Sequence, residues 1–159
     1  MARTSRFFIC GAGLLVAGAL AGGRPAWSQE VLSAEGETPD VRIEIRELSR
    51  GDGGTVTLRL RLVNESGDKF DASCDMRESG NDSCGDFTGA YLLDPVNKKK
   101  YLVVRDADGV CVCSNIDNIE DGKKMNLWAT YPAPPADVQK VTVIVPLFEP
   151  IDGVPITGP

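Results

Sequence analysis

The chain has 159 residues, no histidine and a formal charge of −6 at pH 7. The missing histidine excludes Ser-His-Asp triads, Cys-His pairs and imidazole metal sites. The acidic balance argues against nucleic acid and anionic membrane surfaces as partners, because phosphate binding needs a basic patch. The length suits a single domain that can bury a core without a metal.

Residues 1–28 have the pattern of a secretory signal peptide. Arg3 and Arg6 precede an apolar run over residues 7–22, and Ala26-Trp27-Ser28 is a small-x-small cleavage sequence. The apolar run is glycine-rich and shorter than the ~20 residues of a spanning helix. We expect cleavage after Ser28, which removes three arginines and leaves 14 basic and 23 acidic residues, a formal charge of −9. The sequence thus predicts a periplasmic or secreted protein with no membrane insertion after cleavage.

Residues 29–40 are polar and lack an apolar period, so we expect a flexible N-terminal linker. The domain is predicted over residues 41–156, followed by a tail at 157–159. Its first elements are two alternating apolar runs at 41–45 and 56–62, separated by the glycine-rich turn 51–54. This pattern predicts an antiparallel hairpin with one buried face.

Residues 64–86 are irregular and carry two cysteines. Short strand-like runs follow, each bounded by turn residues, at 90–93, 101–104, 110–113, 125–131, 141–145 and, as a short edge strand, 154–156. Together with the hairpin they make about seven to eight strands, and no stretch has a convincing helical period. We therefore predict an all-β fold, an immunoglobulin-like antiparallel β-sandwich.

Several sequence motifs lie between Tyr91 and Ile156. They include Tyr-Leu-Leu-Asp-Pro at 91–95, Arg-Asp-Ala-Asp-Gly at 105–109, Cys-Val-Cys-Ser at 111–114 and Tyr-Pro-Ala-Pro-Pro at 131–135. The stretch resembles small exported bacterial sandwich domains of uncharacterised function, which occur alone or ahead of OmpA-like peptidoglycan-binding domains. The resemblance implies a β-sandwich, export and a bacterial envelope setting. It brings no catalytic residues with it.

Four cysteines lie outside the leader: Cys74, Cys84, Cys111 and Cys113. An even number in an exported chain predicts disulfides, with three possible connectivities. Cys111 and Cys113 share one face of a strand, so they could bond to each other, bond to the loop cysteines, or stay reduced as a redox or soft-metal pair. If the resembling domains carry this pair without the loop cysteines, the simplest pairing is 111–113 with 74–84. Closing the 74–84 loop is worth roughly 3 kcal/mol.

Trp128 and Tyr131 form a possible contact patch. Trp128 shares its strand face with Asn126 and Thr130, which is compatible with partial exposure, but core packing is the interpretation that we favour. Acidic residues cluster before glycine at 106–109 and 117–122 without the EF-hand spacing, so we expect solvated turns and no metal.

The sequence contains no nucleophile elbow and no phosphate-binding loop. We therefore expect no enzyme activity, no catalytic residues and no cofactor. The predicted function is an exported, disulfide-stabilised binding or structural module of the bacterial cell envelope, whose partner is an unknown envelope protein or polymer. The alternative is a thiol-redox or soft-metal-binding protein that uses the Cys-x-Cys pair. A third hypothesis is a secreted inhibitor or a carbohydrate-binding module that works through Trp128 and neighbouring loops.

Overall fold

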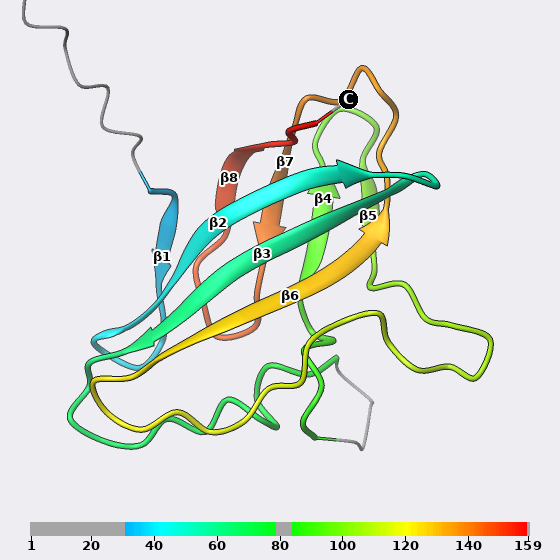
Figure 1. The fold of residues 1–159 in the computed structure, drawn as a ribbon. Helices are drawn as coiled ribbons and strands as arrows, with labels where there is room; N and C mark the ends of the chain where they lie inside the picture. Colours follow the sequence, from blue (N-terminus) through cyan, green and yellow to red (C-terminus); the bar gives the residue numbers. More distant parts are fainter. Residues whose placement is uncertain (1–30, 79–83, 159) are drawn as a thin grey trace, which may run out of the picture.

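The computed structural model describes residues 31–78 and 84–158 (Figure 1). The predicted signal peptide lies outside these residues. The described part contains eight strands, which form two antiparallel four-stranded sheets. In Figure 1 the strands of one sheet cross over those of the other, so the fold is the predicted all-β sandwich.

The first sheet has the order β1-β2-β3-β6, and the second has the order β5-β4-β7-β8. The strands are β1 (Ser33–Glu35), β2 (Val41–Gly51), β3 (Thr55–Asn64), β4 (Tyr91–Asp94), β5 (Lys99–Tyr101), β6 (Lys124–Pro132), β7 (Lys140–Ile144) and β8 (Ile151–Pro155). These sheet orders establish an antiparallel β-sandwich, and the finer immunoglobulin-like identity stays a prediction. Among the described residues no helix is long and apolar enough to cross a membrane.

The predicted hairpin is confirmed as β2 and β3, which pair from Val41↔Asn64 to Gly51↔Thr55. Gly53 and Gly54 make the turn with φ of 79° and 73°, in the left-handed region that glycine enters without a steric cost. A bulge between Ile45 and Glu47 interrupts the alternation. It leaves two successive exposed side chains on β2 before the inward-facing period resumes at Leu48.

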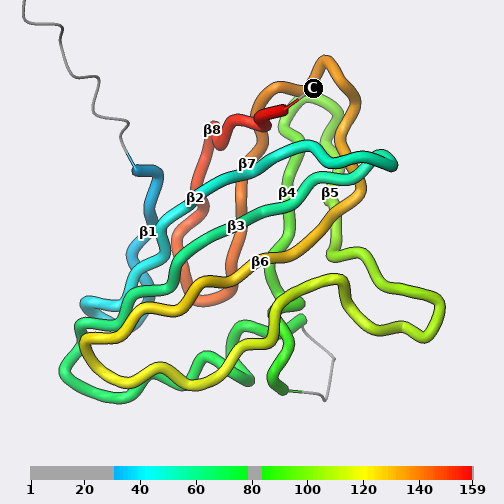
Figure 2. Tube along the Cα trace, viewed as in Figure 1, coloured from blue at the N-terminus to red at the C-terminus, as the bar shows by residue number. Residues whose placement is uncertain are grey.

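The core lies between the two sheets and is built from their inward-facing aliphatic residues. The irregular segment after β3 also contributes, through Phe70, Met76 and Phe87, which are at most 7% exposed. This segment is held against residues 115–123, since Phe70 and Ile119 exchange backbone hydrogen bonds of 2.9 and 3.0 Å. Figure 2 shows the two segments side by side at one end of the sandwich.

The prediction of a flexible linker over 29–40 is wrong for its described part. Residues 33–35 form β1, which pairs with β2 and buries Ala34 opposite Ile43. The chain then contacts the connection between β7 and β8 of the second sheet, where Glu37 N donates to Leu147 O at 2.8 Å. The strand escapes sequence analysis because only one of its three residues is apolar and buried.

The predicted tail also begins inside the fold. Thr157 N donates to Leu48 O at 2.8 Å, and Arg50 N donates to Thr157 O at 2.8 Å. The Arg50 guanidinium in turn donates to the carbonyl oxygens of Pro134 and Val138 at 2.8 and 3.0 Å. The sandwich therefore extends through Thr157 and is tied to the end of β2.

Asn64, which is 0% exposed, joins the end of β3 to both irregular segments. Its amide nitrogen donates to Asp68 O at 2.7 Å and to Ile119 O at 2.9 Å, and its Oδ1 accepts from the Ser66 hydroxyl at 2.7 Å. These bonds satisfy polar groups that packing separates from water.

We expect Asn64→Leu to lower the free energy of unfolding by about 2–3 kcal/mol, because it removes the hydrogen bonds of a buried amide to Asp68 O, Ile119 O and Ser66 and puts a larger apolar side chain in their place. Denaturant titration followed by circular dichroism measures the loss. The exposed Asn126→Ala is the control, with an expected change within about 0.5 kcal/mol. Equal stability of Asn64→Leu and the wild type would overturn the role given to Asn64.

Candidate functional site

Strand β6 places alternate side chains on opposite faces of the first sheet. Trp128 is half-buried on the outer face, between Asn126 and Thr130, so the strand alternation places it correctly and the favoured core packing is wrong. Tyr131 lies on the inner face and is 0% exposed. The prediction of a contact patch that includes Tyr131 is therefore wrong, and Tyr131 is a core residue.

The burial of Tyr131 has an electrostatic consequence. Removal from water raises the pKa of its phenol far above the usual value, because the charged form would lose its hydration. Among the described residues none offers a hydrogen-bond partner to its hydroxyl. Tyr131 is therefore a neutral packing residue, and its side chain is unsuited to binding or acid-base work.

Polar cross-strand pairs surround Trp128 on the outer face. Arg59 is its direct neighbour on β3. On one side Arg61 Nε donates to Asn126 Oδ1 at 3.4 Å, and on the other the hydroxyls of Thr57 and Thr130 lie 3.3 Å apart. The result is a flat face on which one indole is bordered by hydrogen-bond donors and acceptors. We call this surface, made of residues 57, 59, 61, 126, 128 and 130, the Trp128 face.

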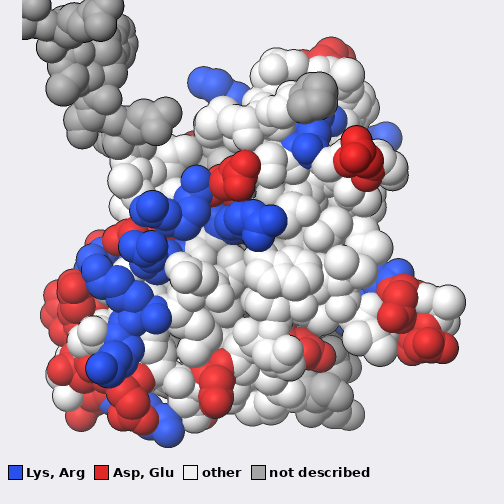
Figure 3. Space-filling model, in the orientation of Figure 1, with Lys and Arg blue, Asp and Glu red and all other residues white. Residues whose placement is uncertain are grey.

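Basic side chains form a band across the first sheet (Figure 3). Glutamates hold several of them in place: Arg42 Nη1 lies 2.6 Å from Glu65 Oε2, and Arg59 Nε lies 3.5 Å from Glu47 Oε2. The hydrogen bond from Arg42 lowers the pKa of the Glu65 carboxyl. The band therefore presents ordered guanidinium groups beside the Trp128 face, in a chain whose overall charge is negative.

The segment 102–114 covers the free edge of β6. Val104 N donates to Thr130 O at 2.8 Å, and Ser114 N donates to Trp128 O at 2.8 Å. The strand predicted at 110–113 is absent as a regular strand, and isolated bridges join Cys111 to Arg105 and Cys113 to Ala129 instead. These hydrogen bonds hold the backbone of Trp128 along the edge of β6 that does not pair with β3.

The four cysteines form two disulfides within the described residues, Cys74–Cys84 and Cys111–Cys113. The connectivity is the simplest pairing considered above, and it leaves neither pair reduced. The first bridge joins cysteines at a sequence separation of 10 and closes a loop within the irregular segment. The second encloses a separation of 2, so it constrains almost no chain.

Asp86 lies beside the second disulfide, which the sequence did not predict. One carboxylate oxygen of Asp86 and the sulfur atoms of Cys111 and Cys113 all lie within 4.8 Å of one another. All three residues are half-buried. The only sequence signal was the Cys-x-Cys spacing, because Asp86 lies in a distant loop and reaches the pair through an isolated bridge to Asn115.

The acidic turns satisfy their own backbone groups. Asp106 Oδ1 accepts from Asp108 N at 3.0 Å and from Val110 N at 2.9 Å. Asp121 Oδ1 accepts from Gly67 N at 3.0 Å. These carboxylates are engaged in the hydrogen bonds that turns require.

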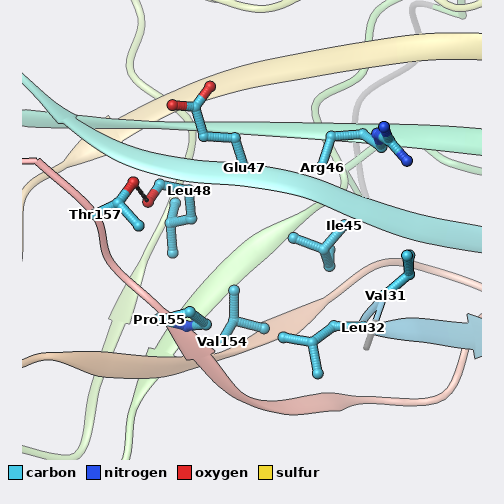
Figure 4. A pocket seen from close by; sticks show the side chains of 9 residues that line it. All are labelled: Val31, Leu32, Ile45, Arg46, Glu47, Leu48, Val154, Pro155 and Thr157. Carbon is cyan, nitrogen blue, oxygen red and sulfur yellow. Dashed lines mark hydrogen bonds between the residues drawn. The ribbon is translucent and has the colours of Figure 1, made fainter. Parts of the chain in front are cut away.

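A shallow groove of about 420 Å³ lies between β2 and the C-terminal segment. In Figure 4 the side chains of Ile45, Leu48 and Val154 point toward one another, whereas Glu47 points away. The lining is mostly aliphatic, with Arg46, Glu47 and Thr157 at its polar part, and it contains no aromatic residue. It therefore lacks the mixture of aromatic and polar groups that the Trp128 face offers.

No family model, curated protein or solved structure matches this chain. The resemblance seen in residues 91–156 therefore stays an expectation, and the function has to be inferred from the residues themselves. Two features of the described surface carry such an inference: the Trp128 face and the Asp86–Cys111–Cys113 cluster.

The two disulfides are expected to contribute unequally to stability. We expect Cys74→Ala with Cys84→Ala to lower the free energy of unfolding by roughly 3 kcal/mol, because the open loop regains chain entropy. Cys111→Ala with Cys113→Ala should cost about half as much, roughly 1.5 kcal/mol, since its loop is minimal. Urea titration of both variants without reductant measures the difference. Equal losses in the two variants would contradict this assignment.

Proposed function

We propose that the protein is an exported, disulfide-stabilised, non-catalytic binding module of the bacterial cell envelope, and that it contacts its partner through the Trp128 face. The observation that carries the proposal is the half-buried position of Trp128 on the outer face of a rigid sheet. Both of its backbone polar groups bond to Ser114, whose N–H donates to Trp128 O at 2.8 Å and whose hydroxyl accepts from Trp128 N at 3.0 Å, and its strand pairs with β3 along the other edge. An indole held in this way loses little conformational entropy when it binds.

The chemistry of the face favours a hydroxyl-rich envelope polymer as the partner. The flat indole offers apolar area and an N–H donor, and the neighbouring groups offer guanidinium, amide and hydroxyl hydrogen bonds. Tryptophan and arginine are also the residues most enriched at the centres of protein interfaces, so an envelope protein is the other outcome that the test must separate.

The disulfides and the leader pattern support the location. Disulfides form and persist in oxidising compartments such as the bacterial periplasm and the extracellular medium. Both pairs are bridged in the structure. A small domain that is clipped in this way suits an exposed envelope setting, where no cytosolic reductant or chaperone acts.

Trp128 is the sole tryptophan once residues 1–28 are removed, so its fluorescence reports directly on the face. We expect the emission to shift when isolated cell-wall polymers are added. In co-sedimentation, Trp128→Ala should weaken binding about thirtyfold or more, the effect of losing a central tryptophan at an interface. Tyr131→Phe is the matched control and should bind like the wild type, because Tyr131 faces the core.

If the emission of Trp128 shifts with an extracted envelope protein and with no polymer, the partner is a protein and the polymer proposal is wrong. Unchanged binding by Trp128→Ala would overturn the assignment of the face.

Export has its own test. We expect the intact mass of the protein recovered from periplasm or medium to begin at Gln29. Thiol labelling without reduction should modify no cysteine, and peptide mapping should find the bridges 74–84 and 111–113. Recovery of the full-length chain in the cytosol with labelled thiols would contradict the export proposal.

A further inference from the structure

The Asp86–Cys111–Cys113 cluster lies where three separate segments meet. Asp86 precedes β4, the two cysteines lie on the segment that covers β6, and the cluster is half-buried. One carboxylate oxygen and two sulfur atoms within 4.8 Å of one another form a set of potential metal ligands once the disulfide is opened.

Backbone hydrogen bonds hold the ligand-bearing segments without help from the disulfide. Phe87 N donates to Ser114 O at 3.0 Å, which ties the residue after Asp86 to the residue after Cys113. Thr130 N donates to Val112 O at 3.0 Å, which fixes the residue between the two cysteines. The cysteine segment is thus anchored on both sides, and we expect it to keep its place when the sulfur–sulfur bond is broken.

We propose that reduction of the Cys111–Cys113 disulfide opens a zinc site whose protein ligands are the two thiolates and the Asp86 carboxylate. The proposal stands apart from the function assigned to the Trp128 face and needs no partner bound there. It gives the Cys-x-Cys pair a role that its small contribution to chain entropy does not supply.

The reaction balances with a dithiol as the reductant. The dithiol transfers two electrons and two protons to the disulfide; its own sulfur atoms become a disulfide, and Cys111 and Cys113 become thiols. Zn²⁺ then binds the two sulfur atoms as thiolates and releases their two protons to water. Neither step changes the oxidation state of zinc.

The geometry suits a tetrahedral ion. Two zinc–sulfur bonds of about 2.3 Å at the tetrahedral angle place the sulfur atoms about 3.8 Å apart. The atoms of the cluster already lie within 4.8 Å of one another, so rotation of the freed side chains is enough to reach this spacing. The carboxylate ligand favours zinc over copper(I), which prefers sulfur alone. The fourth position is left for water.

Neighbouring groups complete the surroundings of the site. Asn115 Nδ2 lies 3.5 Å from Asp86 Oδ1 and can orient the carboxylate as an outer partner. Arg105, opposite Cys111, carries a charge that would oppose a cation. Its guanidinium is engaged by Glu78 Oε2 at 3.0 Å and by Gly109 O at 2.9 Å, so that charge is balanced locally.

The experiment is a zinc titration of the mature chain against a chromophoric zinc indicator, before and after reduction with a phosphine that does not bind zinc tightly. We expect one zinc ion per reduced chain and none per oxidised chain. The Cys74→Ala, Cys84→Ala variant should bind one zinc after reduction, because its remaining thiols are those of the site. Cobalt(II) in place of zinc should give thiolate-to-metal charge-transfer absorption in the near ultraviolet.

Two variants test the ligands. Cys111→Ser with Cys113→Ser should abolish binding. Asp86→Asn should weaken zinc binding at least about tenfold, since even outer-shell partners of a metal are worth 10- to 100-fold. Asp108→Asn, an exposed carboxylate on the adjacent turn, is the matched control and should leave the affinity unchanged.

Three results would overturn the proposal: equal zinc binding by oxidised and reduced chains, binding that survives the double serine substitution, or binding of copper(I) but not zinc. Unchanged affinity in Asp86→Asn would remove the carboxylate from the ligand set. The comparison of oxidised and reduced wild type needs no substitution, and the same comparison in the Cys74→Ala, Cys84→Ala variant assigns the result to Cys111 and Cys113.

Discussion

Burial of one face of the β2–β3 hairpin against the second sheet is the interaction on which the rest of the structure depends. Ile43, Leu58 and Leu60 are at most 1% exposed and belong to the same core cluster as Leu92 and Val143 of the opposite sheet. Each such side chain contributes about 1.5–3 kcal/mol of hydrophobic free energy. The outer face of the first sheet is left free for function, and Trp128 is the large aromatic residue that it carries.

The hairpin could be predicted because its alternation is long and local. The same alternation predicts that Tyr131 faces the core if Trp128 faces outward, because the two residues lie an odd number of positions apart on one strand. Side chains at odd separations point to opposite faces, so a patch containing both residues conflicts with the strand period. The error came from grouping aromatic residues by their proximity in sequence instead of by parity along the strand.

Other features lacked any local signal. β1 is three residues long with a single buried alanine, so its place depends on the partner strand and not on its own sequence. The bulge in β2 shows only as a missing apolar residue between Ile45 and Leu48. Asp86 reaches the cysteine pair across a separation of more than 20 residues through single backbone bridges. Contacts of this kind form only when the chain packs, so they produce no periodic pattern in the sequence.

The two disulfides lie in different structural settings. Cys74–Cys84 closes a polar loop that has few apolar anchors, so its bond is part of the fold. The segment of Cys111 and Cys113 is already bonded to β6, so its bond is dispensable for position. The Ser114 hydroxyl accepts from Trp128 N at 3.0 Å, which places the cysteine segment in direct contact with the strand that carries the Trp128 face.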